Sequence, residues 1–510
     1  MVQRKRPGRS VWAAMLAIVL LLTACGSSGG ESSTAPQGSS TAASEGGREA
    51  PYEIHMVFIG QDQKDFPLIQ EELSRLAKEK INATVKLTPI NWGAWSQQTT
   101  LMLAGNEKID LMVTSNTLYN YSTQVAKGQL LPLNDLLDSH GQGIKEALGE
   151  DFLSAATVDG QAYGVPSLRD MAVNYGFTMR QDLLDKYSID INSIKTLDDV
   201  EAAFKTVKEN EPDVTPFVSA IGGATPIELL YPAYFDLLGD SLGVLPGYDN
   251  NLKVVNMYET PEYAELVKRA RRWYEAGYIA KDASTTREDS STLMKAGTAF
   301  AAASNLKPGI ESQVSNAAGR PVKAAAIFPP VYSTGTISSF MFSIPISSQY
   351  PEKAMEFLNL MYTDPEIVNL LDYGIEGKHY VKKSDNVVGF PDGVDGTNSG
   401  YNLQQGWMFG NQLISYVWED NAPDIWEQTR AFNESAKRSK ALGFIYNSEP
   451  VKTEVAAVLN VVSQFKMGLE TGSVDPEKVL PQFIEQMKAA GIDKIIAEKQ
   501  KQLDAWAAKQ

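Results

Sequence analysis

Apolar residues recur along the chain with two alternating periods. Residues 52–59 form an apolar-rich run that predicts a buried first strand. Residues 66–80 then carry apolar side chains at helical spacing, namely Leu68, Ile69, Leu73, Leu76 and Ala77. Residues 84–88 and 109–113 predict two more strands, with a helix near 95–104 between them. This alternation predicts a mostly parallel sheet covered by helices.

Helix-start signals mark the rest of the chain. Thr196 is followed three residues later by Asp199, an acidic variant of the capping box. Thr260, Asp364 and Asp475 each precede a Pro-Glu pair, which places a cap, a proline and an acid in that order. Residues 324–328 and 339–344 predict strands, and 389–400 predict a loop. The stripe Val455, Val458, Leu459, Val462 and Phe465 predicts a core-packing helix.

Length and charge narrow the class of protein. A chain of 510 residues is long enough for two or three domains. The net charge of −16 repels phosphate backbones, so nucleic acid is not expected as a partner. One cysteine excludes a disulfide framework, and three scattered histidines without HExxH spacing argue against a histidine-based metal site.

The amino terminus accounts for the single cysteine. Basic residues 4–9 and the apolar run 11–22 predict a signal peptide over residues 1–24, because the run is too short to span a bilayer as a mature helix. The run ends in Leu22-Thr23-Ala24-Cys25, which resembles a bacterial lipobox. We expect cleavage before Cys25 and lipidation of its thiol, because two acyl chains anchor a protein stably to a membrane. Residues 25–50 are rich in Gly, Ser, Thr and Ala and predict a flexible linker.

An ordered series of short segments carries a family resemblance. The segments are 90–95, 101–110, 128–133, 158–166, 351–358, 362–366 and 374–380. Together they resemble the family 1 extracellular solute-binding proteins, in particular the large lipoprotein members of multiple-sugar ABC importers. Residues from about 440 onward resemble the uncharacterised carboxy-terminal region of a subset of these lipoproteins.

The resemblance implies an α/β fold of the two-lobed, periplasmic-binding-protein type (type II, with discontinuous lobes). Lobe 1 would comprise 51–166 and 331–385, and lobe 2 would comprise 167–330 and 386–510. Hinges are expected at 163–166 and 328–330, where Pro and Gly interrupt the chain, and ligand would bind in the cleft between the lobes.

A sugar site needs aromatic platforms and planar polar groups in a cleft. Trp92 and Trp95 lie in a predicted strand-to-helix loop, with core packing as the alternative for both. Arg169 would hold hydroxyls or a uronate carboxylate, or else form an interlobe salt bridge. The full set of candidate ligand-binding residues is Trp92, Trp95, Asn116, Tyr119, Tyr121, Arg169, Asp170, Ser304, Asn305, Tyr373, Glu376, Trp407 and Asn411. His379 is expected to be a buried hydrogen-bonded residue and Trp273 a core residue.

The expected function is therefore binding of an oligosaccharide for delivery to membrane permease subunits, by a monomer anchored through Cys25 outside the cytoplasm. Binding of peptide or another solute is the alternative. A secreted glycosidase is a weaker one, because no pair of carboxylates is marked as acid and nucleophile. No catalytic residue and no cofactor are expected, although a structural calcium ion in a loop such as Asp249-Asn250-Asn251 stays open.

Overall fold

The computed structural model describes residues 50–116 and 121–510, and residues 50–510 form one unit. The predicted signal peptide, Cys25, most of the linker and Tyr119 lie outside the described residues. Two large hydrophobic clusters fill the unit, and each surrounds its own sheet.

The first sheet has the strand order β2-β1-β3-β14-β6. Its first three strands are parallel, as the sequence predicts, and β1 pairs with β2 from Tyr52↔Ala83 to Ile59↔Ile90. The last two strands run antiparallel to their neighbours. Their bounds are β1 Tyr52–Ile59, β2 Ala83–Ile90, β3 Leu111–Thr114, β6 Val165–Pro166 and β14 Met341–Ser343.

Helices cover this sheet through their apolar faces. In α1 the buried positions include Ile69, Leu73, Leu76 and Ala77 of the predicted stripe, but Leu68, predicted as part of it, is 38% exposed. The helix ends where Asn82 adopts a left-handed φ of 50°. The helices of this lobe are α1 Phe66–Ile81, α2 Trp92–Ala104, α3 Tyr121–Ala126, α4 Asn134–His140, α5 Gln142–Ser154, α12 Thr334–Ile337, α13 Pro351–Thr363 and α14 Pro365–Tyr373.

The second sheet has the strand order β12-β7-β11-β8 and an aromatic core. The Phe204 ring packs edge-on against Trp273 at 5.2 Å, which confirms the core position predicted for this tryptophan. The strands are β7 Asn174–Arg180, β8 Thr215–Val218, β11 Ala299–Leu306 and β12 Val322–Ala326. The helices are α6 Gln181–Lys186, α7 Leu197–Asn210, α8 Tyr231–Tyr234, α9 Pro261–Glu275, α10 Ser290–Ala296 and α11 Ile310–Ala318.

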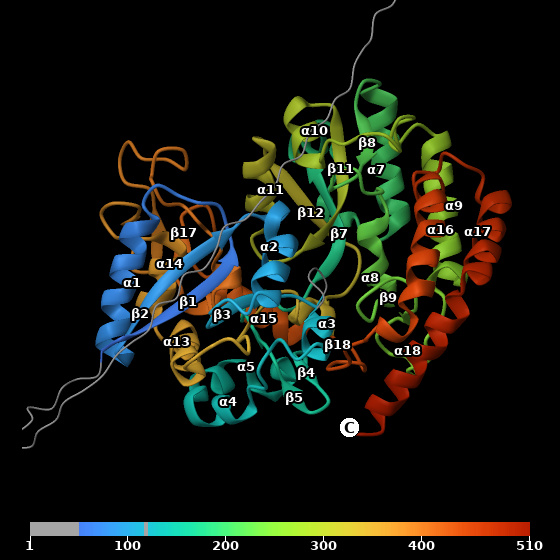
Figure 1. The fold of residues 1–510 in the computed structure, drawn as a ribbon. Helices are drawn as coiled ribbons and strands as arrows, with labels where there is room; N and C mark the ends of the chain where they lie inside the picture. Colours follow the sequence, from blue (N-terminus) through green and yellow to red (C-terminus); the bar gives the residue numbers. More distant parts are fainter. Residues whose placement is uncertain (1–49, 117–120) are drawn as a thin grey trace, which may run out of the picture. The chain divides into compact units, whose positions relative to one another are not determined.

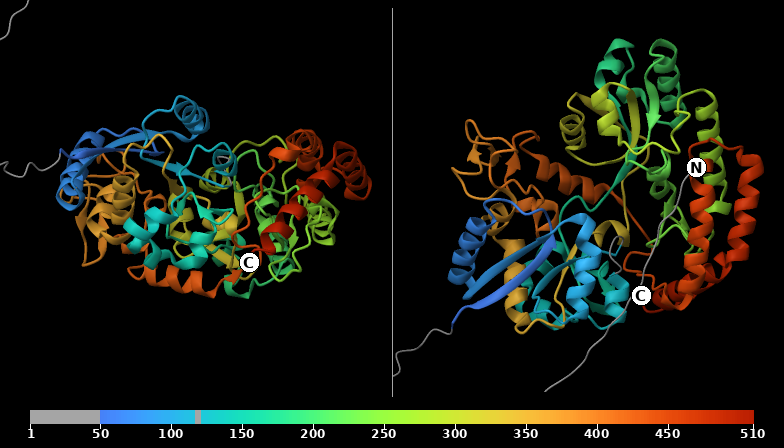
Figure 2. Two further views of the ribbon diagram at one scale, coloured as in Figure 1. Left: turned by 60° about the horizontal axis from the view of Figure 1, so that its bottom comes forward. Right: turned by 45° about the horizontal axis from the view of Figure 1, so that its top comes forward.

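Three long carboxy-terminal helices complete the second core. They are α16 Lys452–Glu470, α17 Pro476–Ala490 and α18 Ile492–Ala507. Val458 and Val462 are buried as the predicted stripe requires, but Leu459 is 50% exposed. Figures 1 and 2 show these helices, coloured red, on the side of the second sheet that faces away from the first sheet.

Residues 386–510 were all expected in lobe 2, but part of the segment 387–435 packs against the first core. Tyr401 packs against Phe66 with ring centroids 5.4 Å apart, and Phe409 packs against Phe58 at the same distance, so this segment belongs to the first core. Before α15 (Ile425–Ser435) its apolar residues lie mostly in loops and short turns, where no helix or strand period marks the core that they join. The elements are β15 Val381–Lys382, β16 Val387–Gly389, β17 Val417–Trp418 and α15 Ile425–Ser435, with a short turn of helix at Gly406–Met408.

Three segments cross between the cores, where the sequence predicts two hinges. Val165–Pro166 is a strand of the first sheet, so the first crossing comes after it, and Val173 exchanges two backbone hydrogen bonds of 2.9 Å with Val331. The second crossing contains β13 (Val331–Tyr332), near the predicted 328–330. The third contains β18 (Lys437–Arg438), which pairs with β13 in parallel. The hinge is therefore a hydrogen-bonded group of three crossing segments.

Candidate ligand-binding cavity

A cavity of about 640 Å³ lies between the two cores. Its walls come from the end of the first sheet, the start of α11, the segment 404–421 and the first turns of α15. Six aromatic residues line it: Trp92, Phe340, Tyr373, Trp407, Trp418 and Trp426. A cavity of this size with aromatic walls is suited to a small organic ligand.

Three of these rings form one cluster. Phe340 and Trp407 lie 4.6 Å apart at 61°, and Trp92 stacks on Trp407 at 6.3 Å and 26°. Trp92 begins α2 because the Asn91 side chain accepts a hydrogen bond from Ala94 N at 3.0 Å and caps the helix. Trp92 remains 45% exposed, so part of its ring is free to contact a ligand.

Two cations and one carboxylate form a triad at the hinge end of the cavity. Arg169 Nη1 donates to Asp170 Oδ1 at 2.7 Å, and Lys307 Nζ approaches Oδ2 at 3.0 Å. Burial raises the pKa of Asp170, but the charges of Arg169 and Lys307 outweigh it and hold the pKa below the usual range. Arg169 Nη2 also donates to Ser339 Oγ at 2.7 Å. Through Lys307 of the second lobe and Ser339, which precedes Phe340, the triad connects the second lobe to the aromatic side of the cavity.

Helix α11 meets the segment around Asp420 across the cavity. Ser312 Oγ donates to the backbone oxygen of Asp420, and Asn316 Nδ2 donates to Asp420 Oδ2 at 3.0 Å. Gly309 precedes α11 with a φ of 80°, and a Cβ at this position would lie 2.9 Å from Asn421 Oδ1. The positive φ favours glycine at this position, and a side chain here would also force Asn421 to shift.

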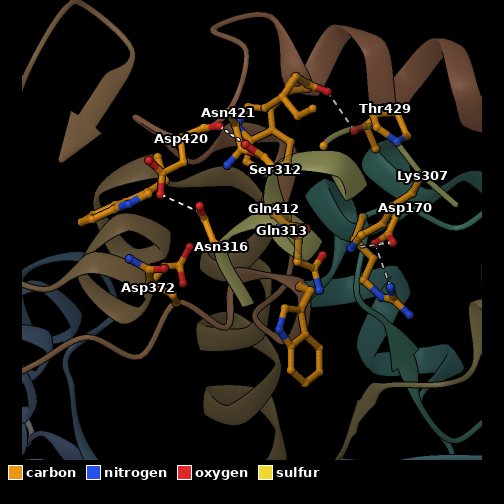
Figure 3. Close-up of a pocket in the computed structure, with 18 of the residues that line it drawn as sticks. Asp170, Lys307, Ser312, Gln313, Asn316, Asp372, Gln412, Asp420, Asn421 and Thr429 are labelled. Carbon is orange, nitrogen blue, oxygen red and sulfur yellow. Dashed lines mark hydrogen bonds and ion pairs between the residues drawn. The ribbon is translucent and has the colours of Figure 1, made fainter. Parts of the chain in front are cut away.

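Asp372 lies in the last turn of α14 and is 2% exposed. Burial raises its pKa to about 7. Figure 3 shows Asp372, Asn316 and Asp420 on one side of the cavity, with Lys307 and Asp170 on the other.

Five of the predicted residues line this cavity: Trp92, Arg169, Asp170, Tyr373 and Trp407. Tyr373 is largely buried, and its hydroxyl donates to Tyr416 O at 2.9 Å. Arg169 forms its salt bridge with the adjacent Asp170 and not, as the alternative predicted, with a residue of the other lobe. Direct contact of these five residues with a ligand stays a prediction.

Two aromatic predictions are wrong because the rings are core residues. Trp95 is 1% exposed and Tyr121 is fully buried, with its hydroxyl donating to Ala156 O at 2.6 Å. Helix α2 begins at Trp92 and not after Trp95, so Trp92 lies at the helix end beside the cavity, whereas Trp95 lies one turn further in and packs in the core.

Five further predicted residues do not line the cavity. Strand β11 runs on to Leu306, so Ser304 lies within the sheet, where its hydroxyl bonds Thr178 Oγ1 at 2.9 Å. Asn305 is exposed in the same strand, and Asn116 lies near Ser338. Asn411 is buried and caps the turn at 412–414, whereas Glu376 is exposed and pairs with Lys382 at 3.7 Å.

Several cavity-lining residues directly follow residues that were predicted to bind ligand, but they were not themselves predicted. Lys307, Pro308 and Gly309 come directly after Asn305, and the Pro-Gly pair was a signal for a turn at the strand end. Gln412, which lines the cavity, likewise comes directly after the predicted residue Asn411. Trp418, Asp420, Asn421 and Trp426 form an aromatic and polar cluster that could have been recognised.

The loop considered for calcium is held by other contacts. Asp249 pairs with Lys440 at 3.0 Å, and the Asn250 side chain bonds Gly247 O and Leu252 N. Within residues 50–116 and 121–510, no group of three or more His, Cys, Asp or Glu side chains is arranged to hold a metal ion. His379 is buried as predicted and bonds Asp65 at 3.1 Å. In the same described ranges, no helix is long and apolar enough to cross a membrane.

Comparison with known proteins supports the fold and identifies the family. Residues 60–367 match the bacterial extracellular solute-binding protein family, and residues 440–508 match a domain of unknown function, DUF3502. A carbohydrate ABC transporter substrate-binding protein of Streptococcus pneumoniae is 31% identical over 97% of both chains.

The N-glycan transport solute-binding protein NgtS, also from S. pneumoniae, is similar in structure. One of its crystal structures aligns with a TM-score of 0.79 at 30% identity, over 89% of this chain and 98% of that one. Its complexes with Man1GlcNAc and Man5GlcNAc align with TM-scores of 0.70 and 0.68, over 89–90% of this chain and 99% of theirs. The predicted two-lobed fold is thereby confirmed. The chain belongs to the bacterial extracellular solute-binding protein family.

Proposed function

We propose that this protein is the oligosaccharide-binding subunit of an ABC importer and holds its ligand in the cavity between the lobes. The observation that carries the proposal is the cluster of Trp92, Phe340 and Trp407 opposite the polar side chains of α11. Pyranose rings present apolar C–H faces that pack on aromatic rings, and their hydroxyls need hydrogen-bond partners around the edge.

Similarity to NgtS supports a neutral oligosaccharide as the first ligand to test. NgtS binds Man1GlcNAc and Man5GlcNAc, and the S. pneumoniae relative is a carbohydrate transporter protein. The same alignment argues against a peptide ligand and against glycosidic cleavage. We expect the bound sugar to be released unaltered.

Ligand would be trapped by closure of the lobes. Lys307, Ser312 and Asn316 come from the second lobe, whereas Trp92 and Trp407 come from the first, so a sugar between them contacts both. A ligand shifts an open–closed equilibrium only by its differential affinity for the two states. Contacts from both walls exist only when the walls are close, and they therefore favour the closed state.

The proposal includes the membrane anchor. The sequence Leu22-Thr23-Ala24-Cys25 supports cleavage before Cys25 and lipidation of its thiol, which would hold the binding protein next to its permease. We propose that it acts as a monomer outside the cytoplasm and docks on permease subunits when closed.

The test is a binding screen of neutral oligosaccharides, beginning with Man5GlcNAc, by thermal shift and then calorimetry. Trp407→Ala should weaken binding by about 1–3 kcal/mol, on the scale of aromatic–base stacking, or roughly 5- to 200-fold. Trp506→Ala is the matched control, because Trp506 is also half-buried but packs on Phe444 at a distance from the cavity. Equal affinity in both variants, or cleavage of the sugar at enzyme-like turnover, would disprove the proposal.

A further inference from the structure

The carboxyl group of Asp372 is buried at the cavity wall without a complete set of partners. Only 2% of the residue is exposed, yet it lines the cavity. Among the described residues, Asp372 Oδ1 has no hydrogen-bond partner. Burying a polar group without a hydrogen bond costs free energy, so such a group calls for an explanation.

The neighbouring donors do not supply that bond. The backbone N–H groups of Gln405 and Gly406 lie close enough to the carboxyl to lower its pKa, although burial outweighs them. A Cβ on Gly406 would lie 2.5 Å from Asp372 Oδ2, so the glycine lets the loop close around one side of the carboxyl. The Tyr373 hydroxyl donates to Tyr416 O, and the Tyr401 hydroxyl donates to Leu371 O. The Tyr373 hydroxyl also lies close enough to the carboxyl to lower its pKa, but its proton goes to Tyr416 O, and Asp372 Oδ1 keeps no partner within the part of the chain that the structure describes.

We propose that the Asp372 carboxylate accepts hydrogen bonds from the hydroxyl groups of a neutral sugar residue and excludes uronate residues from this end of the cavity. The inference rests on the proposed function, because it names the class of sugar that the cavity takes. Asp372 lines the cavity although its carboxyl is buried, so a group that bonds it must be small and must donate a proton, as a hydroxyl does. Trp407 follows Gly406, which contacts Asp372, and Trp418 stacks on Tyr373 at 5.7 Å, so both cavity-lining rings lie near Asp372.

The charges of the cavity favour a neutral sugar at this end. Asp420 is a second carboxylate on the side of Asp372 in Figure 3, whereas Lys307 lies on the other side and is paired with Asp170. Arg169 is likewise paired with Asp170. A uronate placed near Asp372 would meet like charge without a cation to offset it, and like charges in a partly buried site repel strongly.

The proposal predicts proton release on binding. Burial raises the pKa of Asp372 to about 7, and a hydroxyl donor stabilises the charged form, so the pKa must fall when sugar binds. The ionisable groups that face it are the hydroxyls of Tyr373 and Tyr401. His379, whose ring packs 5.8 Å from Tyr401, has a pKa lowered by burial and bonds Asp65. Affinity should therefore rise with pH through about 7.

The experiment compares wild type, Asp372→Asn and Glu470→Gln in calorimetry between pH 6 and 8. The probes are the neutral oligosaccharide that binds best, beginning with Man5GlcNAc, and trigalacturonic acid. Wild-type affinity for the neutral probe should rise up to about tenfold over this range, because ionisation with a pKa near 7 is mostly completed within it. Asp372→Asn should abolish this pH dependence and weaken binding about 10- to 100-fold at pH 8.

Glu470→Gln is the matched control. Glu470 is also fully buried with a pKa raised to about 7, but it does not line the cavity and bonds Thr225 and Tyr263. This variant should keep the wild-type pH profile of affinity.

A measurement on wild type alone covers the case in which Asp372→Asn fails to fold. Calorimetry at pH 7 in two buffers of different ionisation enthalpy should show release of up to about half a proton per sugar bound. Proton uptake, no proton exchange, an unchanged profile in Asp372→Asn, or tighter binding of trigalacturonic acid would each overturn this inference while leaving oligosaccharide binding intact. If no oligosaccharide binds wild type, the proposed function fails as well.

Discussion

Trp92 and Trp95 lie three residues apart in α2, and replacing each by alanine should separate binding from folding. Trp95 is 1% exposed and part of the first core. A buried aromatic side chain removes about 150–250 Å² from water, and at about 25 cal/mol per Å² this amounts to about 4–6 kcal/mol. Large-to-small core replacements of this kind cost about 3–5 kcal/mol. We therefore expect Trp95→Ala to lower the free energy of unfolding by about 4 kcal/mol.

That loss converts to a melting temperature. The entropy of unfolding is about 2.1 cal/mol/K per residue, which gives about 1 kcal/mol/K for the folded unit of residues 50–510. A loss of 4 kcal/mol should lower the melting temperature by about 4 °C if the unit melts as one. The affinity of the remaining folded protein for sugar should stay close to that of wild type.

Trp92→Ala should behave in the opposite way. The ring is 45% exposed and its neighbours are the cavity residues Phe340 and Trp407. Its loss should weaken sugar binding by about 1–3 kcal/mol and lower the melting temperature by no more than about 1 °C. The assay is thermal melting and calorimetric titration of both variants. A pair in which Trp92→Ala melts far lower and binds normally would refute this assignment of the cavity wall.

Three other changes should each give a distinct result. Cys25→Ser should shift the protein out of the membrane fraction or leave it unprocessed, and an unchanged fractionation and size would contradict lipidation. The Asn433 side chain accepts hydrogen bonds from Met171 N and Ala172 N and donates one to the Arg169 carbonyl. Asn433→Ala removes all three, so the free energy of unfolding should fall by about 2–4 kcal/mol. Denaturant unfolding measures this loss, with Asn433→Asp, which keeps the acceptor, as the comparison. Glu470 has a pKa raised from 4.5 to about 7, so its contribution to stability is full below about pH 4.5 and is lost as pH rises through 7. Glu470→Gln should remove this loss of roughly 3 kcal/mol, and equal slopes of stability against pH in both proteins would contradict it.

Regular elements could be predicted from the sequence because their signals are local. The strand 52–59 and the helices capped by Thr196, Thr260, Asp364 and Asp475 all form where periodicity and capping indicate. The two-lobed fold was predictable through the ordered segments of the family.

The cavity was only partly predictable because it depends on where elements end and which core they join. Strand β11 continues through Ser304 and Asn305, and this extension moves the ligand-facing positions to Lys307 and beyond. Asp372 has the sequence signature of an ordinary helix-terminal acid. The loop around Gly406, more than thirty positions away, helps to enclose it.

The winding of the chain between two cores also determines when each core can form. The first core needs residues up to Leu413 and Leu442, and the second needs residues from Phe177 through Ile495. A chain emerging from its amino end can therefore complete neither lobe until most of it is available, and the second lobe only when α18 has arrived. Pairings between such distant positions slow folding. Consequently, we expect docking of the 440–508 region to be the last step of folding. A chain without this region would expose the apolar faces of the helices that cover the second sheet, and exposed apolar surface promotes aggregation.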